Sequence, residues 1–200
     1  HNFDEMNKKN INVSDIVEVK RAGDVIPYVT KLIKKNSKSN NKILYPKTCP
    51  VCGGIAKKEL DEAVLRCTNK FECYSQKIGQ IIHFISKKSL NIDGFGEKQA
   101  KQFFDLKIIN TIDDIFTIEN YKDQIMSLEG WGELSFNNLA NSINKAKNIT
   151  LEKFIYSLGI RFVGEINSEI LANEFGNIEK LISSIQNNKQ LDNIDGIGPK

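Results

Sequence analysis

Apolar residues in the second half of the chain have the spacing of amphipathic helices. Ile78, Ile81, Ile82 and Ile85 lie three and four positions apart, and the same spacing returns between Leu151 and Leu158. This period places apolar side chains on one helical face, which then packs against a core. Strand-like alternation does not interrupt this part of the sequence, so residues after about 75 are predicted to be mostly helical.

The first forty residues follow a different pattern. The segments Ile11 to Val19 and Val25 to Val29 are rich in β-branched residues and alternate with charged ones, which predicts two short strands joined by a charged turn. Two or three strands cannot close a barrel or bury both faces of a sheet. This piece is therefore expected to complete a sheet whose other strands lie before residue 1.

A short glycine motif occurs four times between the predicted helices. Residues 92–96, 128–132 and 194–198 read apolar-acidic-Gly-apolar-Gly, and a looser copy lies at 158–164. In the looser copy, Phe162 stands where the other three have their first glycine. The intervals of about 30–36 residues indicate a repeated helical unit.

The repeated motif favours a nucleic-acid backbone as its target. Two glycines one residue apart permit a tight turn, and they leave backbone N–H groups just ahead of a helix whose dipole favours phosphate. A single copy is explained equally well as a helix C-cap and turn. Four copies predict helix-hairpin-helix motifs.

The motif supplies the candidate DNA contacts. They are Gly94, Gly96, Gly130, Gly132, Gly159, Gly164, Gly196 and Gly198. Contacts of this kind position a protein without reading sequence, so we expect sequence-independent binding to duplex backbone, across the minor groove. Phe95 and Trp131, which lie between the glycines, are predicted to pack into the core, because a duplex offers no unstacked base to an aromatic ring.

All four cysteines lie in one segment, with the spacing Cys-x2-Cys-x14-Cys-x5-Cys. They are Cys49, Cys52, Cys67 and Cys73. This spacing is typical of a tetrahedral zinc site, and Gly53-Gly54 suits the turn after the second ligand. Two disulfides are the alternative, but nothing in the sequence marks a secreted protein. Four thiolates leave zinc no open position, so the predicted ion is structural, and His83 is interpreted as a helix side chain at the core edge.

Charge divides the chain, although the net charge is only +3. Residues 1–90 hold 17 Lys and Arg against 9 Asp and Glu, a balance of +8, whereas residues 91–200 hold 11 against 16, a balance of −5. Backbone amides carry no net charge, so an acidic half remains able to bind phosphate. Apolar runs are too short for a membrane span and no secretory leader is visible, so a cytoplasmic protein is expected.

The order of these parts resembles the carboxyl-terminal half of bacterial NAD-dependent DNA ligase. The resemblance rests on residues 21–27 (RAGDVIP), the cysteine array, residues 91–96 (NIDGFG) and residues 158–165 (LGIRFVGE). It implies an α+β, multi-domain fragment. Residues 1–43 would be the closing part of an OB-fold barrel, 44–75 a four-cysteine zinc finger, and 76–200 a mostly helical helix-hairpin-helix domain cut within its fourth hairpin.

The resemblance also implies an activity and partners. Members of the family seal nicks in duplex DNA in replication and repair. A lysine takes AMP from NAD, the AMP passes to the 5′-phosphate, and the 3′-hydroxyl displaces it with the help of magnesium. That lysine, in a Lys-x-Asp-Gly motif of an adenylation domain, is missing from these 200 residues. They are therefore expected to bind nicked double-stranded DNA as a monomer, at the bacterial nucleoid, and not to react with NAD alone.

Three basic side chains and two departures follow from the resemblance. Lys20 and Arg21 would reach phosphate from the barrel, and Arg161 from the third hairpin. Phe162 stands where these ligases often have histidine, which puts the phosphate contact of that hairpin in doubt. The polar stretch from Asn36 to Lys42 corresponds to a lengthened connection with no assigned role.

Two other functions fit parts of the pattern. One is a non-catalytic helix-hairpin-helix module of another repair or recombination protein. In the recombination mediator, however, the hairpin precedes the zinc site, whereas here four hairpins follow it. The other is a zinc-stapled helical scaffold for protein partners, in which the glycines only make turns. DNA binding that weakens steeply with salt is expected of the ligase and of the repair module, but not of the protein scaffold.

Overall fold

The computed structural model describes residues 3–21, 23, 26–36, 43–59, 62, 64–187 and 191–198. The chain forms two compact units, residues 1–73 and residues 74–200. Small antiparallel strands occur in the first and helices dominate the second, which confirms the predicted α+β class. Among the described residues, no helix has both the length and the apolar character to span a membrane.

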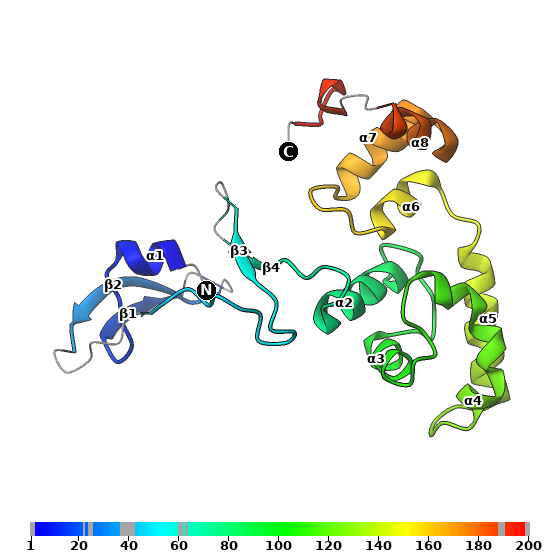
Figure 1. The fold of residues 1–200 in the computed structure, drawn as a ribbon, viewed down its shortest axis with the longest axis horizontal. Coiled ribbons are helices and arrows are strands. Elements are labelled where there is room, and N and C mark those ends of the chain that lie inside the picture. Colours follow the sequence, from blue (N-terminus) through cyan, green and yellow to red (C-terminus); the bar gives the residue numbers. More distant parts are fainter. Residues whose placement is uncertain are drawn as a thin grey trace. The chain divides into compact units, whose positions relative to one another are not determined.

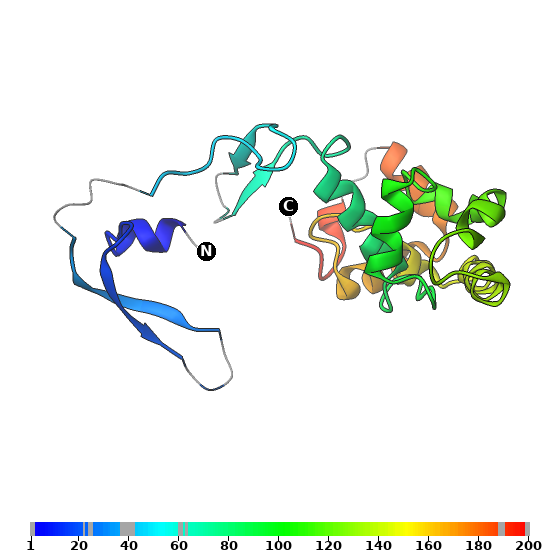
Figure 2. The ribbon, with the colours of Figure 1, turned by 90° about the horizontal axis from the view of Figure 1, so that it is seen from below.

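The first unit begins with a helix and a two-stranded ribbon. The helix α1 (Phe3–Lys8) precedes the strands β1 (Ile16–Lys20) and β2 (Tyr28–Lys34), which pair antiparallel with Lys20 opposite Tyr28. The helix lies beside the ribbon (Figures 1 and 2). Just after it, the Lys9 ammonium donates to the carbonyl oxygen of Val29 at 2.6 Å, which fixes the helix against β2.

The predicted start of the first strand, at Ile11, is wrong: β1 begins at Ile16. The residues before it turn, with a positive φ of +68° at Ser14. The carboxylate of Asp15 accepts a hydrogen bond from the Asn12 amide at 2.8 Å, as such side chains do in tight turns. Local side-chain bonding therefore wins over the extended backbone that β-branched residues favour.

The predicted second strand is displaced as well. It begins at Tyr28 and runs to Lys34, whereas the sequence pattern predicted Val25 to Val29. Pro27 has no N–H to donate to a neighbouring strand, so pairing starts after it. Val25, and residues 37–42 of the polar stretch that begins at Asn36, lie outside the described residues.

The cysteine segment completes the first unit. Strand β3 (Ala56–Lys58) pairs antiparallel with β4 (Leu65–Cys67), and Ala56 stands opposite Cys67. One pair of cysteines precedes this small hairpin and the other closes it. The hairpin is too short to bury a core of its own, which is the situation in which small segments need a metal staple.

The second unit is built from helices (Figure 2). They are α2 (Tyr74–Ile85), α3 (Glu97–Asp105), η1 (Asp113–Tyr121), α4 (Lys122–Met126), α5 (Glu133–Ala146), α6 (Leu151–Ser157), α7 (Glu165–Phe175), α8 (Ile178–Gln186) and η2 (Leu191–Asn193). The elements η1 and η2 are 3₁₀ helices. The predicted apolar stripe between Ile78 and Ile85 is confirmed, since Ile78, Ile81 and Ile85 are buried in α2.

The described helices bury two apolar cores. The first is shared by α2 to α5 and holds Phe95 and Trp131, and the second is shared by α6 to α8 and holds Val163 and Ile197. Figure 1 shows the same two groups of helices. The rings of Phe95 and Trp131 lie 5.5 and 5.2 Å from the ring of Phe103, so the prediction that both aromatic residues pack into the core is confirmed.

Candidate zinc centre and nucleic-acid interface

The four cysteine sulfur atoms converge on one point. All of them lie within 4.8 Å of one another, and those of Cys52 and Cys67 are 3.4 Å apart. A tetrahedron with Zn–S bonds of about 2.3 Å has edges of about 3.8 Å, so the sulfur positions fit zinc. The donor set is all thiolate and provides no place for a substrate, as in structural zinc sites. The predicted structural zinc therefore fits the geometry.

The two glycines after Cys52 have different structural roles. Gly53 takes a positive φ of +70°, and its amide donates to the carbonyl oxygen of Cys49 at 3.0 Å, which closes the turn. Gly54 is needed for space, because a Cβ there would lie 2.8 Å from the Cβ of Asn69. Together they bring the first two sulfur atoms to the same side as the second pair.

Backbone amides surround the thiolates. Gly54 donates to the sulfur of Cys52 and Asn69 donates to the sulfur of Cys67, both at 3.4 Å, and the Asn69 side-chain amide reaches Cys52 at 3.8 Å. Such bonds stabilise negative charge on sulfur. Asn69 is a supporting residue that the spacing of cysteines did not reveal.

These surroundings shift the pKa values of Cys52 and Cys67 in opposite directions. The Gly54 amide, with hydrogen bonds from the neighbouring thiols, lowers the pKa of Cys52 to about 7. The Asn69 amide lowers the pKa of Cys67, but burial and hydrogen bonding with Cys52 and Cys49 outweigh it and raise that pKa to about 11. One thiolate therefore forms easily in the absence of metal, whereas the full set needs a cation to offset its charge.

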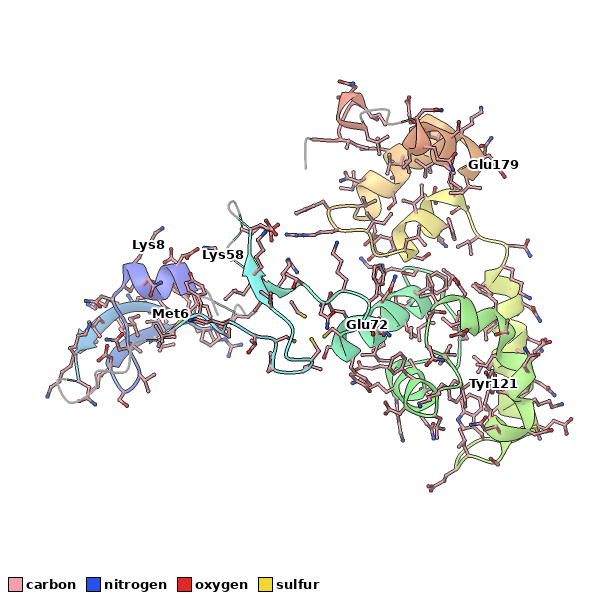
Figure 3. The ribbon with its side chains drawn as sticks, in the orientation of Figure 1. Met6, Lys8, Lys58, Glu72, Tyr121 and Glu179 are labelled. Atoms are coloured by element: carbon pink, nitrogen blue, oxygen red, sulfur yellow. The ribbon has the colours of Figure 1, made fainter. Side chains whose placement is uncertain are left out.

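A three-residue cluster connects α1 to the finger. The Lys58 ammonium, which projects from β3 (Figure 3), lies 2.6 Å from Oδ2 of Asp4, and the Tyr45 hydroxyl donates to Oδ1 of the same carboxylate, also at 2.6 Å. The Phe3 ring packs on Tyr45 with centroids 4.6 Å apart. The sequence pattern gave no sign of this cluster, because its members lie up to 54 residues apart.

The four glycine motifs share one backbone turn. The amides of Phe95, Trp131, Val163 and Ile197 each donate to the carbonyl oxygen three residues earlier, at 3.3, 3.1, 3.0 and 3.0 Å. The residue before each of these has a positive φ, namely Gly94 (+78°), Gly130 (+80°), Phe162 (+66°) and Gly196 (+87°). A positive φ at the third position is what a type II turn requires, and glycine provides it without strain. The looser copy therefore has the same turn as the other three.

The second glycine of each motif has a different conformation. Gly96, Gly132 and Gly164 are extended N-cap residues with φ of −90°, −156° and −83°, which any residue adopts. A Cβ at Gly132 or Gly164 would meet nothing within 4 Å, and at Gly96 only the end of the Gln99 side chain. The described part of the chain thus gives no steric reason for glycine at these exposed positions.

The amides at these positions differ in availability. Within the described part of the chain, those of Gly96 and Gly164 have no hydrogen-bond acceptor, whereas that of Gly132 donates to the Ser135 hydroxyl at 2.9 Å. Ser135 is a capping residue that the glycine motif did not reveal. The first and third hairpins therefore offer a donor at this position that the second has already used.

Acidic side chains flank the same helix starts. Glu97, Glu133 and Glu165 are the first residues of α3, α5 and α7. Ion pairs offset two of these charges, since Lys101 lies 2.5 Å from Glu97 and Lys88 lies 2.5 Å from Glu165. The negative charges of Glu97 and Glu165 are thus offset locally at the first and third hairpins.

Gly159 has a structural reason of its own. It follows the end of α6 with φ of +63°, as a residue that ends a helix does. A Cβ there would lie 3.2 Å from Cδ2 of His83, so the helix ends against that ring. Asn91 takes the equivalent place in the first hairpin with φ of +51°. A role in DNA binding is not needed to explain this glycine.

The basic residues proposed for the barrel lie at the β1–β2 turn. Lys20 ends β1, and its ammonium lies 3.8 Å from Oε2 of Glu18. The ammonium of Lys31 lies 3.9 Å from Oε1 of the same carboxylate. Arg21 follows in the turn and is exposed. Two of the cations on this ribbon, Lys20 and Lys31, thus share the Glu18 carboxylate.

A four-thiolate site joined to a series of type II hairpins defines a zinc-finger, helix-hairpin-helix protein. Three family models match: "NAD-dependent DNA ligase OB-fold domain" over residues 1–41, "NAD-dependent DNA ligase C4 zinc finger domain" over residues 48–74, and "Helix-hairpin-helix motif" over residues 153–200. The zinc-finger match contains all four cysteines, and no rival class of protein is favoured by these matches.

Curated relatives agree with the domain matches. The chain is 45% identical to the DNA ligase of Pelagibacter ubique, over 99% of this chain and 30% of that ligase. It is 42% identical to the DNA ligases of Wolbachia pipientis wMel and of Ehrlichia chaffeensis, in each case over all of this chain and 31% of the relative. The chain belongs to the NAD-dependent DNA ligase family, and it spans about 30% of the length of these relatives.

Proposed function

We propose that this chain is the part of an NAD-dependent DNA ligase that holds nicked duplex DNA. The hairpins would bind the sugar-phosphate backbone through Gly94, Gly96, Gly130, Gly132, Gly159, Arg161, Gly164, Gly196 and Gly198, and the barrel segment through Lys20 and Arg21. Family membership and the shared turn geometry support this proposal. Domain boundaries near residues 43 and 75 are part of it.

The observation that carries the proposal is the second glycine of each hairpin. In the first three hairpins it is exposed and lies at the start of a helix, and at Gly132 and Gly164 the fold has ample room for a side chain. A phosphate that approaches the backbone closely would exclude a Cβ there, and it would accept from the first amides of the helix. This binding would not depend on base sequence.

The zinc ion would hold the finger in one conformation without taking part in chemistry. Its ligands would be Cys49, Cys52, Cys67 and Cys73, whose sulfur atoms already lie within 4.8 Å of one another. When bound, zinc supplies the positive charge that lets all four thiols ionise together. Asn69 and Gly54 would keep the thiolates oriented through the N–H···S bonds described above.

Nick sealing would require more than these residues. By family membership, the adenylation lysine, NAD and magnesium would act mainly in the remainder of the longer protein, and this chain would not react with NAD alone. We place that protein in the bacterial cytoplasm, at the nucleoid, acting as a monomer. The contribution of this chain would be to keep the two ends of the nick in one duplex while the reaction proceeds.

Binding of the 200-residue chain to fluorescent duplexes tests the proposal. We expect nicked duplexes of unrelated sequence to bind equally well, with affinity that falls steeply as salt rises. The double variant Gly96→Ala with Gly164→Ala should bind more weakly while its circular dichroism stays unchanged. Strong preference for one base sequence, or the same affinity in the double variant, would count against the proposal.

A further inference from the structure

The third hairpin differs from the others at two adjacent turn positions. The second residue of the turn is acidic in three hairpins, at Asp93, Glu129 and Asp195, and it is Arg161 in the third. The third residue of the turn is glycine in three hairpins, and it is Phe162 in this one. The backbone turn is the same, so the difference lies wholly in the two side chains that it presents.

The backbone of Phe162 is unfavourable for a residue with a side chain. Its φ is +66°, in the left-handed region that glycine occupies without strain. Asn167 steadies the strained residue, since its side-chain amide donates to the carbonyl oxygen of Phe162 at 2.8 Å. Strain that is kept at an exposed position indicates that the side chain has a use, because glycine would make the same turn more stable.

Core packing does not account for Phe162. The residue of this hairpin that packs against the second core is the next one, Val163, just as Phe95 and Trp131 do in the first core. Phe162 is 50% exposed, as is Ile160, and Ile166 at the start of α7 is 74% exposed. Three large exposed apolar side chains thus lie within seven residues of this turn and helix start.

Arg161 adds a cation to this apolar group. Its guanidinium carbon lies 4.5 Å from the centre of the Phe162 ring, which is the geometry of a cation–π pair. The pair presents a flat apolar ring and a positive charge side by side. Duplex DNA offers the matching pair of surfaces in its minor groove, where apolar deoxyribose edges line the walls and phosphates form the rims.

We propose that Arg161 and Phe162 enter the minor groove of bound duplex DNA together, with the Phe162 ring against deoxyribose and the Arg161 guanidinium at a phosphate. This inference rests on the proposed function and adds a contact that the glycine hairpins lack. The third hairpin holds DNA by side chains, whereas the other turns place glycine or an acidic residue at these positions. A stacked base is not required, because a duplex has no unstacked base to offer.

The variant Phe162→Gly tests the proposal directly. It relieves the positive φ, so the thermal midpoint should stay the same or rise, while affinity for a nicked duplex should fall roughly 3–10-fold, the size expected for one aromatic contact. Phe162→Asn is a second variant, because asparagine tolerates positive φ but has no apolar ring; it should weaken binding to a similar extent. Ile185→Ala, an exposed apolar position on α8 outside the hairpins, is the control and should bind as the parent chain does.

Salt dependence separates the two side chains. Arg161→Ala should reduce the slope of log affinity against log salt by about 0.9, the value for one phosphate contact, whereas Phe162→Gly should leave the slope unchanged. If both Phe162 variants bind as tightly as the parent chain, the proposed contact of Arg161 and Phe162 with the minor groove is wrong. Backbone binding by the glycine hairpins would not be contradicted by that result. If the parent chain itself does not bind nicked duplex, the proposed function fails and this inference fails with it.

Discussion

His83 of α2 and Tyr156 of α6 join the two halves of the helical unit. Nε2 of His83 lies 2.8 Å from the carbonyl oxygen of Tyr156, so this nitrogen carries the proton and donates. The two rings are 4.9 Å apart, and Gly159 ends the helix against the imidazole. A histidine that the sequence pattern placed at a core edge thus connects the first core to the segment that leads into the third hairpin.

Replacing His83 with alanine should loosen this connection. The carbonyl of Tyr156 would lose its donor and the ring contact would disappear, which should lower the stability of the helical unit by about 1–2 kcal/mol. Chemical denaturation followed by circular dichroism measures the loss. Lys87→Ala, on an exposed neighbouring residue, is the matched control, and equal stability of the two variants would contradict the role given to His83.

Alanine at two glycines of the third hairpin should affect different properties: stability at Gly159 and DNA affinity at Gly164. Gly159→Ala should cost about 1–2 kcal/mol of stability, because φ is positive there and the new Cβ would lie 3.2 Å from His83. Gly164→Ala should change stability by less than about 0.5 kcal/mol, since alanine's poorer capping is offset by its smaller unfolded-state entropy. DNA affinity should fall chiefly for the second. A large stability loss in Gly164→Ala would show that the fold, not a partner, requires that glycine.

Zinc removal should unfold the cysteine segment. Structural zinc contributes roughly 10–16 kcal/mol of apparent binding free energy in small fingers, far more than a segment of this size can lose. We expect one zinc per chain by metal analysis, and loss of hydrogen-exchange protection in residues 44–75 after chelation or in Cys67→Ser. The helices of residues 74–200 should keep their far-ultraviolet signal. Unchanged protection after complete metal removal would refute a structural role for the ion.

The link between α1 and β3 should depend on pH. Hydrogen bonds from Lys58 and then Tyr45 lower the pKa of Asp4 from its ordinary value of 3.8, so the stabilisation is present above that value and lost as pH falls through the lower, folded-state pKa. The Asp4 hydrogen bond raises the pKa of Lys58, so the same link persists below the ordinary lysine range and is lost as pH rises through the raised value.

Comparing Asp4→Asn with the parent chain measures this link. The variant should have the lower thermal midpoint at neutral pH, and the difference should shrink in acid, where the parent carboxylate becomes protonated. Glu5→Gln, which changes a carboxylate of the same helix outside the cluster, serves as the control. A difference that stays constant from neutral pH into strong acid would mean that Asp4 acts by something other than its charge.

Periodicity and spacing were enough to predict that residues after about 75 are mostly helical and that the four cysteines form one zinc site. The apolar residues of α2 depend only on the helical repeat, and a tetrathiolate needs only four cysteines at suitable intervals, so both are local in the sequence. The aromatic residues of the first two hairpins were also correctly predicted as core residues. The helical stripe and the cysteine spacing depend on short stretches of chain alone, whereas Trp131 packs on Phe103 of an earlier helix.

Long-range contacts could not be predicted in this way. The helix α1 has six residues and no buried one, and it is held by Lys58 and by the bond from Lys9 to β2. The strand boundaries also moved, because Asp15 accepts hydrogen bonds from backbone amides in a turn and Pro27 has no N–H to donate. The positive φ of Phe162 was visible only by comparison with the other three hairpins, since phenylalanine by itself gives no such signal.

The distribution of the four hairpins over two cores limits how the number of hairpins can change. Phe95 and Trp131 pack in one core, and Val163 and Ile197 pack in the other, so each core is filled in part by the apolar residues of two turns. A duplication or deletion of one hairpin would leave a core with one such residue too many or too few. Viable changes in length during evolution or engineering should therefore come in twos.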